Sequence, residues 1–354
     1  MPRQSAIKVG KRILSRAHAP FIIAELSGNH SQDYEIACKM VDVAAKCGVD
    51  AIKLQTYTAD SMTLNIDTPD FTIQEENNLW SGEKLHGLYQ KAATPYQWHQ
   101  ALFERAKSHG IEAFSSPFDA HAVDFLDDLN VPCFKIASFE LTDLPLIAHA
   151  ATKGKPLIMS TGMASLSEIE EAVSCAKKYG AKDIILLKCT STYPASPENT
   201  NLITMETMRD LFGCQVGLSD HTKGIGVSIA SVALGASVIE KHFVLDRSAG
   251  GVDAAFSLEP DELKSLVDES KRAWASLGEI TFGGAPVEEK SKQYRRSIYV
   301  KKPIAAGEVL SAENLQIVRP AFGLSPKHWW SVVDKYASCD LAVGTPLAWE
   351  HISS

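Results

Sequence analysis

The sequence predicts a (βα)8 barrel followed by a small β-rich domain, because two patterns alternate along most of the chain. Short β-branched runs of strand length recur eight times. They are Phe21–Ala24, Ala51–Leu54, Ala113–Ser115, Phe134–Ala137, Leu157–Ser160, Ile184–Lys188, Gln215–Leu218 and Ser237–Glu240. The stretches between them carry apolar residues at i, i+3, i+4 and i+7, the spacing of helices that cover a sheet. The clearest of these are Asp33–Lys46, Tyr96–Ser108, Ser167–Tyr179, Ile225–Leu234 and Pro260–Leu277.

The length of the repeating part favours a closed barrel over an open sheet. Eight units that end near Gly278 fit the ~250 residues of a (βα)8 barrel. A doubly wound open sheet is the alternative, but such sheets usually carry a G-x-G-x-x-G turn after the first strand. Here Glu25-Leu-Ser-Gly-Asn-His30 stands at that place. Residues 58–94 are too many for a plain connection, so we expect them to form an insertion over the barrel mouth.

The end of the barrel and the start of a second domain are marked by turn and charge signals. We expect the barrel to span residues 1–282, a linker 283–296 and the small domain 297–354, because Phe282-Gly-Gly-Ala-Pro286 precedes the charged run Glu288–Arg296. Short strand patterns then follow, at Arg296–Val300, Ile304–Gly307, Leu315–Arg319 and Leu341–Pro346. So short a segment buries little core by itself, and we therefore expect it to pack against a partner.

The composition excludes several classes of protein. With a net charge of -8, 45% hydrophobic and 22% charged residues, the chain has a globular composition and lacks the basic field that nucleic acid or anionic lipid requires. Its seven cysteines are scattered and never form a CxxC pair, which disfavours zinc fingers and disulfide frameworks. No run approaches the ~20 apolar residues of a membrane span, and Phe21–Ala24 is too short for a signal-peptide core. We expect a cytoplasmic protein with no nucleic-acid and no membrane partner.

Polar residues stand at the end of nearly every predicted strand, where the active site of a (βα)8 barrel lies. They are Glu25 and His30, Lys53 and Gln55, Ser115 and Ser116, Lys135, Ser138 and Glu140, Ser160 and Thr161, Lys188, Ser191 and Tyr193, Ser219, Asp220 and His221, and Glu240, Lys241 and His242. Lys53 and Gln55 are two residues apart and so share one face of their strand. Lys135 lies in an apolar strand, where a buried ammonium needs an anion.

These strand ends indicate an anion site. A single lysine at a strand end is as often part of an ordinary ion pair as of a functional site. Two lysines together with several hydroxyl groups, and with the backbone amides near Gly162, indicate a site for a phosphate and a carboxylate.

His221 and His242 end two neighbouring predicted strands, so their imidazoles can converge on one ion. A single histidine here would more often be a hydrogen-bonded core residue, but the matched positions favour a metal site. Two imidazoles suit an octahedral Mn²⁺, Mg²⁺ or Co²⁺ site completed by water and substrate oxygens better than a closed tetrahedral zinc site.

Ordered motifs along the whole barrel resemble the sialic acid synthase family. They are Phe21–His30, Lys53–Thr56, Ser116–Phe118, Lys135–Ser138, Ser160–Met163, Tyr193-Pro194, Gly217–Thr222 and Glu240–Phe243. The tail, with Arg296-Ser-Ile-Tyr and Val318-Arg-Pro320, is similar to the antifreeze-like (SAF) domain of that family. The resemblance implies that phosphoenolpyruvate is condensed with an open-chain N-acetylated sugar to a nine-carbon 2-keto acid, with release of phosphate.

The resemblance also implies roles for residues at matching motif positions. His221 and His242 would bind the divalent metal. The residues implied to hold phosphoenolpyruvate are Lys53, Lys135, Ser116, Ser138, Ser160 and Ser219. The residues implied to face the sugar or transfer protons are Glu25, Glu140 and Asp253, while Gln55 and Tyr193 would line the site. Arg319 would reach from the SAF domain into the partner barrel of a homodimer.

Some stretches depart from the N-acetylneuraminate branch of the family and point to another sugar. Ser191 stands where that branch carries an asparagine, and we expect Ser191 to bind substrate in place of that asparagine. Phe139 stands where that branch carries a small residue. Leu54–Thr58, Lys188–Pro194 and Pro320–Pro326 resemble the pseudaminic acid branch, whose substrate is 2,4-diacetamido-2,4,6-trideoxy-L-altrose. The alternatives are an N-acetylneuraminate or legionaminate synthase, a Schiff-base aldolase using Lys135, and a non-catalytic carbohydrate-binding barrel.

Overall fold

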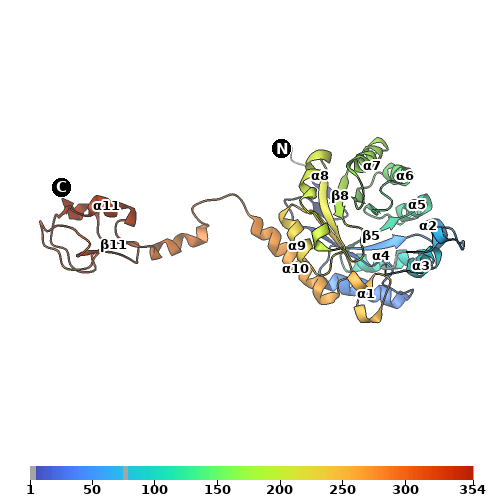
Figure 1. The fold of residues 1–354 in the computed structure, drawn as a ribbon, viewed down its shortest axis with the longest axis horizontal. Helices are drawn as coiled ribbons and strands as arrows, with labels where there is room; N and C mark the ends of the chain where they lie inside the picture. The colour runs from blue at the N-terminus through green and yellow to red at the C-terminus, as the bar shows by residue number, and fades with distance from the viewer. Residues whose placement is uncertain (1–4, 75–78, 354) are drawn as a thin grey trace. The chain divides into compact units, whose positions relative to one another are not determined.

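The first part of the chain forms a closed barrel of eight parallel strands (Figure 1). The computed structural model describes residues 5–74 and 79–353, and the chain divides into two compact units between Gly278 and Glu279. The barrel strands are β3 (Phe21–Glu25), β4 (Ala51–Thr56), β5 (Glu112–Pro117), β6 (Phe134–Ile136), β7 (Leu157–Ser160), β8 (Ile184–Cys189), β9 (Gln215–Asp220) and β10 (Val238–His242). Pairing of β10 with β3 closes the barrel. The predicted fold class is therefore confirmed.

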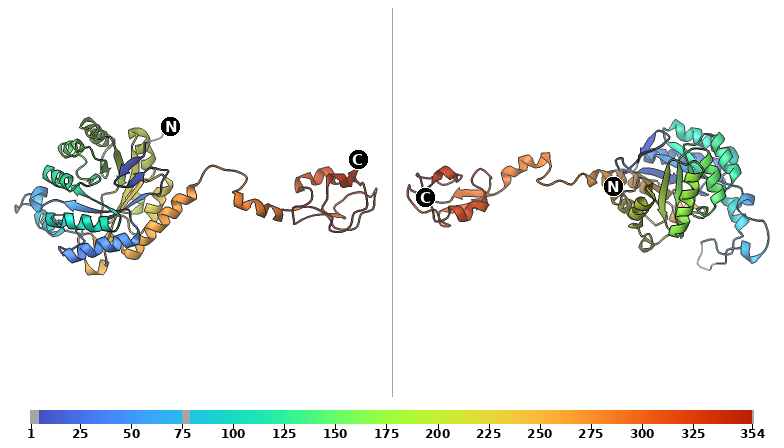
Figure 2. Two further views of the ribbon diagram at one scale, coloured as in Figure 1. Left: turned by 180° about the vertical axis from the view of Figure 1, so that it is seen from behind. Right: turned by 90° about the horizontal axis from the view of Figure 1, so that it is seen from above.

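Helices cover the outside of the barrel, as the views in Figure 2 show. They are α1 (Tyr34–Cys47), α4 (His99–Ser108), α5 (Ala120–Asp128), α6 (Leu144–Thr152), α7 (Leu166–Lys178), α8 (Thr204–Phe212), α9 (Gly226–Ala233) and α10 (Pro260–Leu277). Their ends follow from local side-chain chemistry. Asp33 accepts hydrogen bonds from two backbone amides at the start of α1, and Gly48 ends that helix with a φ of 85°.

The strands are buried on both faces, which is why their sequences are apolar almost throughout. Side chains alternate between the barrel interior and the helix layer. Even two lysines, Lys135 and Lys241, are among the largest fully buried side chains. Each of them must therefore have an anionic partner inside the protein.

Two features of the first unit differ from the expected βα alternation. Its N-terminal segment forms a hairpin of β1 (Ile7–Val9) and β2 (Arg12–Leu14), which the sequence analysis did not predict. The hairpin contributes buried apolar side chains to the core of the barrel. The long insertion after β4 contains α2 (Ala59–Met62) and α3 (Leu85–Ala92), and its residues 75–78 lie outside the described part.

The second unit has a small core of its own. Strand β11 (Ser297–Val300) pairs with β12 (Leu315–Val318), and β13 (Tyr336–Ala337) pairs with β14 (Ile352–Ser353). The buried core residues are Ile298, Val300, Ile304, Leu310, Leu315, Val332, Ala337, Leu341 and Leu347. This core is larger than the sequence analysis expected. The unit also contains α11 (Trp329–Val332) and, within the expected linker, a 3₁₀ helix at Pro286–Tyr294.

Two of the strands expected in the second unit are absent. Ile304–Gly307 and Leu341–Pro346 contribute only isolated bridges, including Ile304 with Leu341. Prolines and glycines in and beside both segments interrupt a regular ladder, since proline lacks the N–H donor and glycine weakens a strand. Across the described residues, no helix is long and apolar enough to cross a membrane.

Candidate active site

The carboxyl ends of β3 and β4 bring an ion pair into the barrel interior. The Lys53 ammonium lies 3.0 Å from Glu25 Oε2, and both side chains are almost fully buried. Gln55 Nε2 donates to Glu25 Oε1 over 3.0 Å, and Lys53 Nζ donates to Ser116 Oγ on β5 over 3.4 Å. Lys53 and Gln55 thus converge on one carboxylate, as expected for residues two apart on a strand.

Glu240 on β10 joins the two predicted site lysines. Its carboxylate oxygens lie 3.2 Å from Lys53 Nζ and 3.6 Å from Lys135 Nζ. Ser219 on β9 donates to Glu240 Oε1 over 3.0 Å. Glu240 is therefore the anion that the buried Lys135 requires. The sequence pattern places Glu240 at a strand end without indicating a role for it. Glu240 lies two residues before His242 and so points inward with it.

Burial and charge shift the pKa values of these groups in different directions. Burial, countered by Lys53, raises the pKa of Glu25. Burial would also raise that of Glu240, but Lys135 and Lys53 together hold its pKa below the usual value. Burial would lower the pKa of Lys53, but the neighbouring carboxylates of Glu240 and Glu25 outweigh burial and raise it. Burial lowers the pKa of Lys135, because the carboxylate of Glu240, at 3.6 Å, offsets that effect only in part. Burial raises the pKa of Glu140 to about 7.

Three of the predicted serines cluster around Gly162, in the loop after β7. Gly162 N donates to Ser138 Oγ over 3.2 Å. A Cβ at Gly162 would overlap Ser191 Oγ, so a larger residue at position 162 would displace this hydroxyl group. Ser160 Oγ is buried and has no hydrogen-bond partner among the described residues. An unpaired buried hydroxyl at this end of the barrel suits an incoming oxyanion.

The imidazoles of His221 and His242 lie side by side, with ring centroids 5.3 Å apart. His221 Nδ1 is 2.9 Å from the Thr190 carbonyl oxygen and donates to it. His242 Nδ1 is 3.3 Å from Ser27 Oγ and 3.8 Å from Asp253 Oδ2. Because the Nδ1 atom of each ring is engaged in this way, the Nε2 atoms are left as the donors for a metal.

The donor set at this place fits an open metal site. Within residues 5–74 and 79–353, no group of three or more His, Cys, Asp or Glu side chains is arranged to hold an ion. Two imidazoles would leave most coordination positions to water and substrate, as in catalytic rather than structural sites. Burial and the neighbouring His221 keep the pKa of His242 well below its ordinary value, which favours the neutral ring that binds metals. Burial opposes the charge on His221 as well, but Cys189 raises the pKa of His221 above its ordinary value.

Aromatic rings form one wall of the site, next to the histidines. Tyr193 has its ring centroid 4.6 Å from that of His221, 5.3 Å from Phe256 and 6.0 Å from Trp80. Trp80 belongs to the insertion after β4, and its Nε1 donates to the Val252 carbonyl over 3.1 Å. The insertion therefore contacts the loop after β10, which supports its expected place at the barrel mouth.

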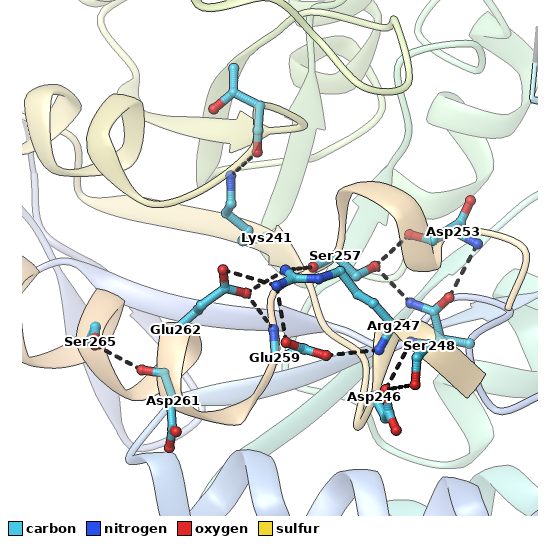
Figure 3. A network of polar contacts seen from close by, with 12 residues as sticks. Lys241, Asp246, Arg247, Ser248, Asp253, Ser257, Glu259, Asp261, Glu262 and Ser265 are labelled. Carbon is cyan, nitrogen blue, oxygen red and sulfur yellow. Dashed lines mark hydrogen bonds and ion pairs between the residues drawn. The ribbon is translucent and has the colours of Figure 1, made fainter. Parts of the chain in front are cut away.

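The loop after β10 carries Asp253 and is held by hydrogen bonds that Figure 3 shows in part. Ser257 Oγ donates to the Asp253 carbonyl over 2.6 Å. Asp253 N donates to Asn29 Oδ1 over 3.2 Å, and the Asn29 amide donates to Ser257 Oγ over 2.8 Å. These contacts place the Asp253 carboxylate beside His242. Arg319 belongs to the second unit, where its side chain is exposed at the end of β12.

Comparison with protein families matches both units of the chain. A model of the NeuB family matches residues 40–281, and a model of the SAF domain matches residues 295–353.

Several characterised relatives align over nearly the whole chain. A pseudaminic acid synthase of Campylobacter jejuni is 44% identical over 92% of this chain and 95% of its own length. A pseudaminic acid synthase of Helicobacter pylori is 43% identical over 94% of this chain and 98% of its own. An N,N'-diacetyllegionaminic acid synthase of Legionella pneumophila is 38% identical over 94% of this chain and 95% of its own length.

A solved structure has the same architecture. The N-acetylneuraminic acid synthetase of Leptospira borgpetersenii, crystallised with citrate, superposes with a TM-score of 0.72 at 34% identity. The match covers 81% of this chain and 95% of that one.

Proposed function

This chain belongs to the NeuB family, and from that membership we propose that it catalyses the pseudaminic acid synthase reaction. Phosphoenolpyruvate and 2,4-diacetamido-2,4,6-trideoxy-L-altrose would give a nine-carbon 2-keto acid and phosphate. The observation that carries the proposal is the joint placement of Lys53, Lys135 and the His221–His242 pair at one end of the barrel. The choice of sugar follows the relatives, since identity to pseudaminic acid synthases is 43–44% and to a legionaminic acid synthase 38%.

The lysines and hydroxyl groups suit the two anionic groups of phosphoenolpyruvate. In the part of the chain that the structure describes, the Lys135 ammonium has long contacts at 3.6 Å to Glu240 and 3.3 Å to the Ile136 carbonyl. A substrate oxyanion would replace them with shorter charge-assisted hydrogen bonds. Ser116 accepts a hydrogen bond from Lys53 and Ser219 donates to Glu240. Ser138, Ser160 and Ser191 would add further hydroxyl groups for the substrate.

The histidine pair suits a divalent cation, which we propose to be Mn²⁺, Mg²⁺ or Co²⁺ bound through the two Nε2 atoms. When bound, such an ion polarises the aldehyde carbonyl of the open-chain sugar as a Lewis acid. His221 is oriented for this role by Thr190, and His242 by Ser27.

The buried carboxyl groups suit the proton transfers. In the reaction, C3 of phosphoenolpyruvate bonds to the aldehyde carbon, whose oxygen takes up a proton. Water adds to C2, and phosphate leaves as the 2-keto group forms. Glu25 and Glu140 have raised pKa values and so can exchange a proton near neutral pH. Gln55 orients the Glu25 carboxyl through its hydrogen bond.

Glu140 should make the stability of the protein depend on pH. Its pKa is about 7 in the folded state, whereas the ordinary value for a glutamate is 4.5. Between pH 4.5 and pH 7 the folded chain therefore keeps a proton that the unfolded chain has lost. The free energy of unfolding should therefore fall as the pH rises through this window, by about 1–3 kcal/mol. Glu140→Gln removes this penalty and should gain that amount over the native protein at pH 8, but little at pH 5.

Urea unfolding at the two pH values measures this difference. Glu171→Gln, at an exposed position of α7, is the control and should follow the native protein. Equal stability differences between Glu140→Gln and the native protein at both pH values would contradict the assignment.

We also propose a homodimer in which Arg319 of one protomer completes the site of its partner. Arg319 is exposed, and the next residue is held in place because Ser297 Oγ donates to the Pro320 carbonyl over 2.7 Å. Mixing Arg319→Ala subunits, inactive by themselves, with Lys135→Ala subunits should restore about a quarter of the native activity, because each mixed dimer has one intact site. No recovery, when mass spectrometry shows that subunits have exchanged, would refute the shared site.

Phosphate release from phosphoenolpyruvate, measured with and without the diacetamido sugar and Mn²⁺, tests the proposed reaction. Release that depends on the sugar and equals the 2-keto acid formed is expected. A carbohydrate-binding protein would release none. A Schiff-base aldolase would instead be trapped on Lys135 by borohydride in the presence of the keto acid.

A further inference from the structure

A second ion pair lies directly behind the two site histidines, on the outer face of the same strands. Asp220 and Lys241 are opposite each other in the parallel ladder of β9 and β10. Each precedes a histidine, so strand alternation turns them away from the barrel interior while His221 and His242 point into it. Lys241 Nζ is 2.8 Å from Asp220 Oδ2, and both side chains are completely buried.

Asp220 binds the chain just after His221 and also helix α9. Its Oδ1 accepts hydrogen bonds from the backbone N and the hydroxyl of Thr222, over 2.8 and 2.7 Å. Its Oδ2 accepts from Ser228 Oγ on α9 over 2.6 Å. Since His221 lies between Asp220 and Thr222, its backbone is fixed on both sides.

Lys241 extends the same network to the second histidine. Besides Asp220, its ammonium donates to the Thr222 carbonyl over 2.5 Å. Figure 3 shows Lys241 beside the polar network of the loop after β10, in which Arg247 binds Glu259 and Glu262. The residue next to Lys241 is His242, so one buried pair ties together the two backbone segments that carry the imidazoles.

We propose that the Asp220–Lys241 pair is a positioning device that sets the separation of His221 and His242, and thereby the affinity of the divalent-cation site. The pair faces away from the reacting groups and so touches neither substrate nor ion. A buried ion pair costs much desolvation and often adds little to folding stability compared with apolar side chains of the same size. Its contribution here is to geometry. The inference rests on the metal site of the proposed function.

The test compares Mn²⁺ binding to the metal-free full-length chain and its variants, by the electron paramagnetic resonance signal of free Mn²⁺. Asp220→Asn combined with Lys241→Met removes both charges and leaves no lone buried ion. We expect Mn²⁺ affinity to fall at least about tenfold, since small misplacements of ligands weaken such sites by about 10–100-fold. The affinity for phosphoenolpyruvate should change by less than about threefold, because Lys53 and Lys135 are untouched.

A matched control is Asp268→Asn combined with Lys264→Met, which removes an exposed ion pair on α10 and should leave Mn²⁺ affinity unchanged. Native-like Mn²⁺ binding by the folded Asp220–Lys241 double variant would overturn the proposal. Failure of this double variant to fold would also overturn the proposal, because the pair would then be needed for the stability of the fold and not for the geometry of the metal site. If the native chain itself bound no Mn²⁺, the metal site would fail along with the inference, whereas sugar-dependent phosphate release would test the reaction separately.

Discussion

Replacing His221 with alanine is expected to abolish synthase activity, as is removal of divalent metal with a chelator. Without the His221 imidazole, the cation that would polarise the aldehyde is lost. Such ions stabilise the transition state by several kcal/mol. The fall in kcat should therefore be at least about a hundredfold. Adding Mn²⁺, Mg²⁺ or Co²⁺ should restore the chelated native enzyme but not the variant.

The matched control is His149→Ala. His149 is a partly exposed residue of α6 that pairs with Asp124, and its loss should leave activity unchanged. Full turnover by His221→Ala in the presence of a chelator would show that the metal assignment is wrong.

The second large effect is expected at Lys135. Lys135→Ala removes a charge-assisted contact to the substrate oxyanion worth about 1.5–3 kcal/mol. It also leaves Glu240, 3.6 Å away in the native protein, with one close lysine, Lys53, in place of two, so more of its negative charge faces the substrate oxyanion. We expect kcat/KM for phosphoenolpyruvate to fall by about 10–150-fold. Lys53→Ala should act in the same direction, and sugar binding should change less in both.

Steady-state kinetics with each substrate varied in turn measures this effect. Adding Glu240→Gln to Lys135→Ala should recover part of the loss, because the repelling carboxylate is removed. Lys264→Ala, on the exposed face of α10, is the control. An unchanged response to phosphoenolpyruvate in both lysine variants would remove the lysines from the anion site.

The fold could be predicted closely because each barrel strand is a short apolar run buried on both faces. The strand predicted at Leu157–Ser160 has the observed bounds, and the helix at Pro260–Leu277 agrees as well. The β1–β2 hairpin was missed because its apolar residues are separated by basic ones, as in an exposed terminus. In the second unit, bridges around proline and glycine resembled strands in the sequence.

The site was predictable where strand period alone decides direction. Lys53 and Gln55 share a face, and His221 and His242 end neighbouring strands. What a side chain contacts across the barrel is not encoded in its local pattern. The role of Glu240 between two lysines depends on the meeting of β4, β6 and β10 in space. The contact of Trp80 with Tyr193 depends on how a long insertion folds back.

The most direct test of the account is a competition between sugars. The purified enzyme, with phosphoenolpyruvate and Mn²⁺, is offered 2,4-diacetamido-2,4,6-trideoxy-L-altrose together with the sugar precursors of N,N'-diacetyllegionaminate and N-acetylneuraminate, and the products are resolved by mass spectrometry and chromatography. The account predicts that the altrose derivative is consumed first, with the highest kcat/KM, and yields a nine-carbon 2-keto acid and an equal amount of phosphate. Preferential use of either other sugar, or no sugar-dependent phosphate release, would contradict it.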